Sequence, residues 1–200
     1  MKTLFRILSI GCALSGILLA PATAQAAAES FFVDWSGAAW LNSAEAHGVL
    51  TVDDTLFPPS SPGSLLLPGV EVLDFSITVS GATNGNGSFQ LSDYAGFVWT
   101  TSSDPGTAVS LDLSQELVGQ ATFGGLWGSG NDGSSGDFSL FANSGSSAPS
   151  AYLPFIIAAN NGLGDTMSLV SFRPVPVPAA IWLFGSALAG LSLAGKRNSA

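Results

Sequence analysis

The strongest constraint on the fold is a strict alternation of apolar and polar residues between positions 73 and 80. The apolar members are Leu73, Phe75, Ile77 and Val79, and the polar members between and after them are Asp74, Ser76, Thr78 and Ser80. A period of two places all apolar side chains on one face of an extended strand. The pattern predicts a β-strand whose four apolar side chains face a core.

Other segments repeat this pattern less fully. Residues 88–92, 109–114 and 137–140 alternate clearly, and less regular strand candidates lie at 31–35, 48–52, 96–100, 120–127, 152–158 and 166–172. Turn-forming residues separate them, with loops predicted at 57–63, 81–87, 128–136 and 143–150, and a brief helical turn at 114–119. About nine or ten short strands favour an all-β fold, an antiparallel β-sandwich or jelly-roll-like domain.

The N-terminal residues 1–26 have the features of a secretory signal peptide. Lys2 and Arg6 precede an apolar run at 7–20 and a stretch of small residues. Signal peptidase would find an A-x-A site at Ala24 and Ala26, so the mature chain is expected to begin at Ala27; a cut after Ala24 is the second choice. The single cysteine, Cys12, lies inside this segment, so the mature protein has no disulfide and no cysteine ligand.

The C-terminal residues 174–200 form a segment with three parts. A proline motif comes first, then an apolar helix at 179–194, then the basic pair Lys196 and Arg197. The apolar length suits a single transmembrane helix, and the basic pair would hold its end on the cytoplasmic side. Alternate prolines force an extended backbone, which suits recognition by another protein. An ordinary membrane anchor behind a proline linker is the alternative.

The motif itself reads Val175, Pro176, Val177, Pro178 and Ala179. It resembles the PEP-CTERM protein-sorting signal in its V-P-x-P-A (VPLPA) variant, with Val177 where Leu is commoner. Residues 180–188 also match the family's phrasing AxWLFGSxL. The resemblance covers about an eighth of the chain. It implies export across the inner membrane of a Gram-negative bacterium, processing by an exosortase, and a setting of biofilm or exopolysaccharide matrix. It implies no catalytic residue, because the signal is a substrate.

Charge is distributed unevenly along the chain. All fourteen acidic residues lie between Glu29 and Asp165, whereas the five Lys and Arg residues lie in the terminal segments or at position 173. An exported domain of residues 27–173 would therefore carry a net charge of −13, with Arg173 as its single base. Nucleic acid is excluded as a partner, since phosphates require basic side chains. High negative charge favours solubility, and neutral sugars and divalent cations remain compatible ligands.

A glycine-rich loop at residues 131–137 contains the candidate metal ligands Asp132 and Asp137. Calcium binds clusters of oxygen ligands, but this loop has no EF-hand spacing and lacks the closing glutamate. A solvated turn is the simpler interpretation, and the same holds for Asp53 and Asp54 at a strand end. No cofactor is expected, with calcium as the alternative.

Catalytic patterns are weak. His47 is the single histidine, so a Ser-His-Asp triad could include it, but no G-x-S-x-G motif accompanies any serine and no second histidine exists for a metal pair. Glycoside hydrolysis needs two carboxylates, which any set of fourteen acids supplies nominally. We expect no enzyme, and keep a polysaccharide hydrolase as the third hypothesis.

Aromatic side chains are the remaining candidates for binding. Six rings could stack on sugars: Trp35, Trp40, Trp99, Trp127, Tyr94 and Tyr152. Rings of this kind more often fill the core of a β domain. Together with what the resemblance of the tail implies, the sequence predicts an exported, non-enzymatic protein of the cell envelope or exopolysaccharide matrix, sorted by an exosortase. A carbohydrate-binding β-sandwich module is the alternative.

Overall fold

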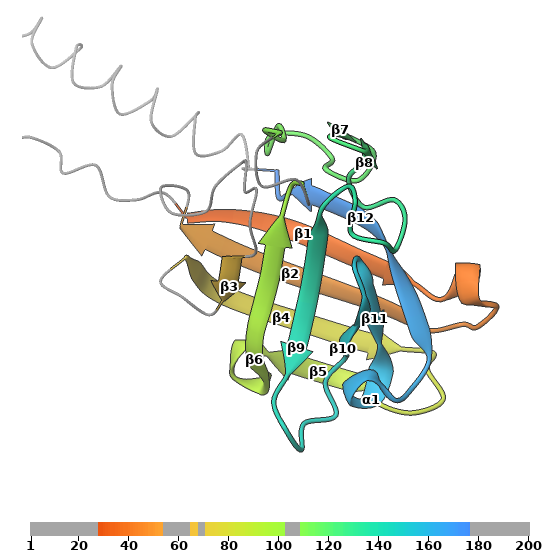
Figure 1. Ribbon diagram of the computed structural model, residues 1–200. Helices are drawn as coiled ribbons and strands as arrows, with labels where there is room; N and C mark the ends of the chain where they lie inside the picture. Colours follow the sequence, from red (N-terminus) through yellow and green to blue (C-terminus); the bar gives the residue numbers. More distant parts are fainter. Residues whose placement is uncertain (1–27, 54–64, 68–70, 103–108, 177–200) are drawn as a thin grey trace, which may run out of the picture.

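A computed structural model describes residues 28–53, 65–67, 71–102 and 109–176 (Figure 1). The predicted signal peptide and the predicted transmembrane helix at 179–194 lie outside these residues. Within them, no helix has the length and hydropathy needed to span a membrane.

The described chain is mostly β-structure, and every strand pair is antiparallel. A seven-stranded sheet has the order β10 (Ser150–Leu153), β11 (Ile156–Ala158), β12 (Thr166–Pro174), β1 (Ala28–Ser36), β2 (Glu45–Asp53), β4 (Val72–Ser80) and β5 (Gly87–Gln90). A three-stranded sheet has the order β3 (Leu65–Leu67), β6 (Tyr94–Thr100) and β9 (Asp137–Ala142). The short strands β7 (Ala121–Thr122) and β8 (Gly125–Leu126) form a hairpin, and the helical turns are η1 (Ala38–Trp40), η2 (Leu91–Asp93) and α1 (Ala159–Gly162).

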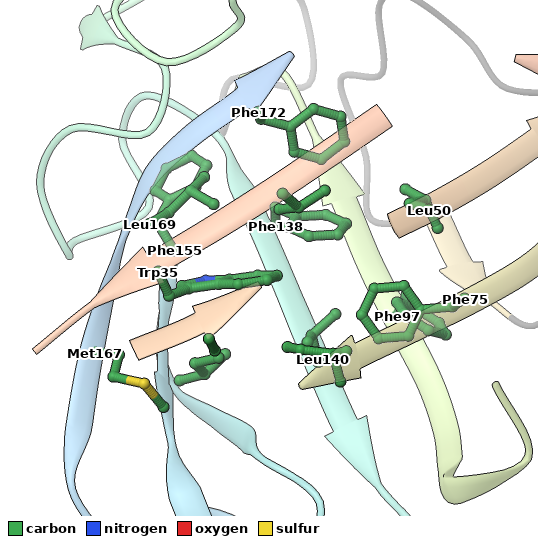
Figure 2. Packing of buried hydrophobic residues seen from close by; sticks show 14 of the residues in the cluster. Trp35, Leu50, Phe75, Phe97, Phe138, Leu140, Phe155, Met167, Leu169 and Phe172 are labelled. Atoms are coloured by element: carbon green, nitrogen blue, oxygen red, sulfur yellow. The ribbon is translucent and has the colours of Figure 1, made fainter. Parts of the chain in front are cut away.

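The core lies between the seven-stranded sheet and the strands β6 and β9, which cross it in Figure 1. Trp35 of β1 stacks on Phe138 of β9 with ring centres 6.0 Å apart. Phe75 of β4 meets Phe97 of β6 edge to face at 5.0 Å. Figure 2 shows these rings converging from both sheets. Alternation in the strands therefore buries one face of each sheet against the other, and the predicted antiparallel β fold is confirmed.

The prediction that Leu73 faces the core is wrong. Phe75, Ile77 and Val79 are buried as predicted, but Leu73 is half exposed and Val72 is buried instead. The ladder between β2 and β4 shifts here, because Val52 pairs with Val72 while the neighbouring Thr51 pairs with Asp74. Leu73 is the extra residue of a β-bulge, which turns its side chain outward.

The strand predicted at 109–114 is also wrong. Leu111 is buried, but residues 109–114 join no ladder. Side chains satisfy the backbone there: Asp112 Oδ1 accepts the Ser114 N–H at 3.0 Å, and Gln120 bonds both the N–H and the carbonyl of Asp112. Such local bonds compete with strand pairing. Residues 114–119 likewise form turns rather than the predicted helical turn.

Two long strand candidates are tight hairpins. Residues 152–158 split into β10 and β11 around Pro154 and Phe155, and residues 120–127 split into β7 and β8. The three-residue strand β3 was not predicted, nor were the turns η1 and α1. Each of these elements is too short to show a period in the sequence.

Candidate functional site

The six aromatic candidates divide into four core residues and two surface residues. The four core residues are Trp35, Trp99, Trp127 and Tyr94. Their rings cannot stack on a sugar; they fill the core, which is the interpretation that the sequence favoured. Burial also raises the pKa of the Tyr94 phenol, whose hydroxyl has no hydrogen-bond partner among the described residues. Trp40 and Tyr152 remain, with 38% and 55% of their surfaces exposed.

Trp40 is held by the loop between β1 and β2. The loop closes with a bond from the Gly37 N–H to the Ala44 carbonyl, and a Cβ at Gly37 would collide with the Asn42 side chain. Asn42 donates its side-chain amide to the Thr166 carbonyl at the start of β12. The indole N–H of Trp40 donates to Ser168 Oγ at 2.8 Å. Two contacts to β12 therefore fix both the loop and the ring.

Tyr152 is turned outward by a bulge in β10. In the pairing of β10 with β11, Ala151 faces Ile157 and Leu153 faces Ile156, so Tyr152 is the extra residue. Bulges re-aim side chains at sheet edges, and β10 is the edge strand of its sheet. The ring of Tyr152 meets that of Trp40 at 6.3 Å in an edge-to-face arrangement. Two residues that are distant in the sequence, Trp40 and Tyr152, thus form one exposed aromatic pair.

A cleft of about 380 Å³ adjoins Trp40. Its lining combines apolar surface with uncharged polar groups: Ala39, Trp40, Gly128, Gly130, Asn131, Phe155, Ile156 and Ser168. Ligand sites of small molecules have this size and this mixture of apolar walls and few polar groups. An aromatic ring beside hydroxyl and amide groups suits a sugar, which has apolar ring faces and polar edges.

Two residues beside this cleft have strained backbones. Leu41 has φ of 58° and Phe155 has φ of 61°, a region that apolar side chains rarely adopt. Phe155 is buried against Trp127, and its carbonyl accepts the Leu169 N–H at 2.8 Å. Leu41 is almost fully exposed. Strain of this kind concentrates at functional sites, which supports this end of the molecule as a candidate binding site.

The two candidate calcium ligands have structural partners. Asp132 Oδ1 accepts the N–H and hydroxyl of Ser134, and these bonds lower the pKa of that carboxyl. Asp137 lies in β9, where burial raises the pKa of its carboxyl although Ser139 donates to it at 2.7 Å. Among the described residues, no three His, Cys, Asp or Glu side chains form a metal-binding group. The expectation of no cofactor and its alternative, calcium, both stay untested.

His47 lies among acids on the exposed face of the large sheet. Its Nδ1 is 2.9 Å from Asp34 Oδ1, and its Nε2 is 3.6 Å from Glu45. These carboxylates raise the pKa of His47, with the Asp34 hydrogen bond as the largest cause. Arg173 bonds the other oxygen of Asp34 at 3.0 Å and lies over the Phe32 ring. The ring atom that a serine nucleophile would need faces Glu45 instead.

The predicted sorting motif begins where β12 ends. Pro174 pairs with Phe31 of β1, and the N–H of Val175 donates to the Ser30 carbonyl at 2.7 Å. Pro176 is described and exposed. The other predicted processing residues lie outside the described residues: Ala24, Ala26, Ala27, Val177, Pro178, Ala179, Lys196 and Arg197.

Sequence reasoning singled out Trp40 and Tyr152 but missed Ser168 and Phe155. Ser168 lies in a segment predicted as a strand, and nothing in the sequence tells that its hydroxyl meets an indole 128 residues away. Asn131 belongs to the loop considered for calcium, and the structure places it in the cleft instead. Comparison with protein-family models, curated proteins and solved structures finds no match for this chain.

Proposed function

We propose that this chain is an exported, non-enzymatic protein of the cell envelope or exopolysaccharide matrix, which an exosortase sorts through its C-terminal signal. The support is the order of signals at the two ends of the sequence and the resemblance of residues 175–179 to the sorting motif. A jelly-roll-like or sandwich domain of high negative charge suits an extracellular setting, because it stays dispersed.

The arrangement of β1 and β12 adds to this support. These neighbouring strands are the first and last of the described domain, and Phe31 faces Pro174 across their ladder. The two processing segments therefore attach at the same end of the domain. This arrangement leaves the opposite end, with the cleft, pointing away from a membrane that holds the tail.

The test compares the chain in a host with an active exosortase and in the same host without it. We expect a shortened product in the envelope or medium of the first host, and the full-length form in the inner membrane of the second. Mass analysis should find Ala27 as the first residue in both. Identical products in both hosts would overturn the sorting proposal.

Carbohydrate binding is a second candidate function, which the exposed pair of Trp40 and Tyr152 favours. Rings fixed before binding lose little entropy when a ligand arrives, and the Ser168 bond fixes the indole. The cleft beside them offers Asn131 and Ser168 as hydrogen-bonding groups. No nucleophile is required for this role.

A glycan array with the full-length chain tests this candidate. Trp40→Ala should abolish the signal for every glycan that the wild type binds. Phe141→Ala is the matched control, since Phe141 is a comparably exposed aromatic residue outside this cleft. An equal loss of glycan signal in both variants, or no loss in either, would contradict the cleft as the binding site.

A further inference from the structure

The charge around the cleft determines which sugars it can accept. Its polar lining consists of the Asn131 amide, the Ser168 hydroxyl and backbone groups, all uncharged. An exposed carboxylate beside it belongs to Asp132, which follows Asn131 directly. Asp132 Oδ1 lies 3.9 Å from the position that a Cβ on Gly130 would take, and Gly130 lines the cleft. Asp137 also lies near, because its Oδ1 accepts the N–H of the cleft residue Phe155 at 3.3 Å, but its carboxyl is partly buried and bonded to Ser139. Asp132 is therefore the exposed carboxylate at the edge of the site.

The basic groups of the described chain lie elsewhere. Arg173 is its single Lys or Arg, and its guanidinium is paired with Asp34. Ser168 of the cleft and Arg173 stand five residues apart on β12, on the order of 17 Å along a strand. That separation exceeds the screening length of physiological salt, about 8 Å. His47 is paired with Asp34 as well. No described cation is therefore available to a ligand in the cleft.

Cations, in contrast, have two sources of attraction here. The faces of Trp and Tyr rings attract ammonium groups, and Trp40 and Tyr152 are both exposed. Asp132 keeps its charge in mild acid, because the Ser134 N–H and hydroxyl lower the pKa of its carboxyl. An anionic ligand would meet the same carboxylate in a domain, residues 27–173, whose net charge is −13, and no described Lys or Arg stands beside the cleft.

Resting on the proposed carbohydrate binding, we infer that this cleft selects glycans with free amino groups, through Asp132 and Trp40, over acetylated glycans and uronic acid glycans. The ammonium group of the sugar lies toward Asp132 and its ring packs against Trp40. Selection arises from charge, because an amino sugar and its acetylated form share the same ring.

The experiment measures binding of three tetrasaccharides to the full-length chain in a neutral detergent by calorimetry at mildly acidic pH. The probes are tetraglucosamine, tetra-N-acetylglucosamine and tetragalacturonate. We expect tetraglucosamine to bind about two- to fivefold more tightly than the acetylated form, the range of an exposed ion pair. Tetragalacturonate should not bind. Asp132→Asn should remove the preference and leave binding of the acetylated form unchanged.

The control is Asp112→Asn. Asp112 makes the same turn as Asp132, with bonds of 3.0 and 2.6 Å from the N–H and hydroxyl of Ser114. Its sequence neighbours do not line the cleft, whereas Gly130 and Asn131 beside Asp132 do. Asparagine keeps the accepting oxygen in both variants, so both turns persist. A preference that survives Asp132→Asn, or Trp40-dependent binding of tetragalacturonate, would overturn the charge selection alone. Absence of Trp40-dependent binding for all three probes would overturn carbohydrate binding itself.

Discussion

The hydrogen bond of 2.8 Å between Trp40 and Ser168 links the loop after β1 to β12, the last strand along the described sequence. The bond spans 128 residues of sequence and fixes the exposed indole. Because the ring is fixed before a ligand arrives, its orientation costs little entropy on binding. Ser168 is therefore a positioning residue for the cleft rather than a binding group alone.

Ser168→Ala should weaken glycan binding about three- to tenfold, since the freed indole loses rotamer freedom on binding. The free energy of unfolding should change by less than about 0.5 kcal/mol, because the bond is exposed to water. Calorimetry and urea unfolding measure the two effects. Ser168→Thr retains the hydroxyl and should bind like the wild type; equal weakening in both variants would contradict the role of the bond.

Leu41→Gly should stabilise the protein by up to about 1 kcal/mol. Leu41 has φ of 58° and is almost fully exposed, so its side chain contributes strain and little packing. Leu163→Gly is the matched control: Leu163 is similarly exposed, but its φ of −106° is unstrained. Denaturant unfolding should show a gain at position 41 and a loss or no change at position 163. A loss of stability in both variants would contradict backbone strain at Leu41.

Ile77→Asp should unfold the domain, because it buries an unpaired charge at a residue that is 1% exposed. The expected cost exceeds about 4 kcal/mol. Thr78→Asp changes the neighbouring residue, whose hydroxyl is exposed and bonds Ser88, and should be nearly neutral. Leu73→Asp should also be tolerated, because the bulge turns Leu73 outward. Circular dichroism of the three variants checks the register.

The stability of the protein should fall as pH rises past the pKa of His47. Asp34 and Glu45 raise that pKa above the 6.5 of an unfolded chain, while Thr78 faces His47 from β4 without charge. A raised pKa means that the charged form stabilises the fold, so the contribution is complete below 6.5 and lost above the folded value. Its size is below about 1 kcal/mol, as for exposed ion pairs. Urea titrations of the wild type should show this fall, and His47→Gln should remove it.

Replacing Pro176 and Pro178 with Ala should separate recognition from anchoring. The apolar length is unchanged, so the chain should still enter the membrane. The extended motif is lost, so processing should stop and the full-length form should accumulate in the inner membrane. Replacing Lys196 and Arg197 with Ser should instead weaken retention and orientation. Normal processing of the proline variant would identify the tail as an ordinary anchor.

Period-two patterns predicted the long strands because their alternation reflects burial of one face directly. They failed at Leu73 and at residues 109–114, where a bulge and side-chain hydrogen bonds to the backbone decide the outcome. Neither feature changes the local order of apolar and polar residues. The pattern records which side chains are buried, but not which backbone groups pair.

The candidate site was partly predictable. Trp40 stands outside every predicted strand and is exposed, whereas Trp35, Trp99 and Trp127 stand inside predicted strands and are buried. Tyr152 breaks this rule, because it lies at a bulge of an edge strand. The polar side chains of the cleft, Asn131 and Ser168, come from two segments that are distant in the sequence, and no local pattern shows that they meet.

The course of β12 along β1, from Ser168 beside the cleft to Pro174 at the other end, has a mechanical consequence. The hydrogen bonds between β12 and β1 run perpendicular to the strands. Beyond Pro174, the N–H of Val175 also donates to the Ser30 carbonyl. A polymer held at Trp40 and a tail held at Pro176 would pull on opposite ends of this strand pair. Such tension loads the hydrogen bonds in shear, all at once rather than one by one. The domain would then resist flow and stretching as a tensile link between a surface and a polymer.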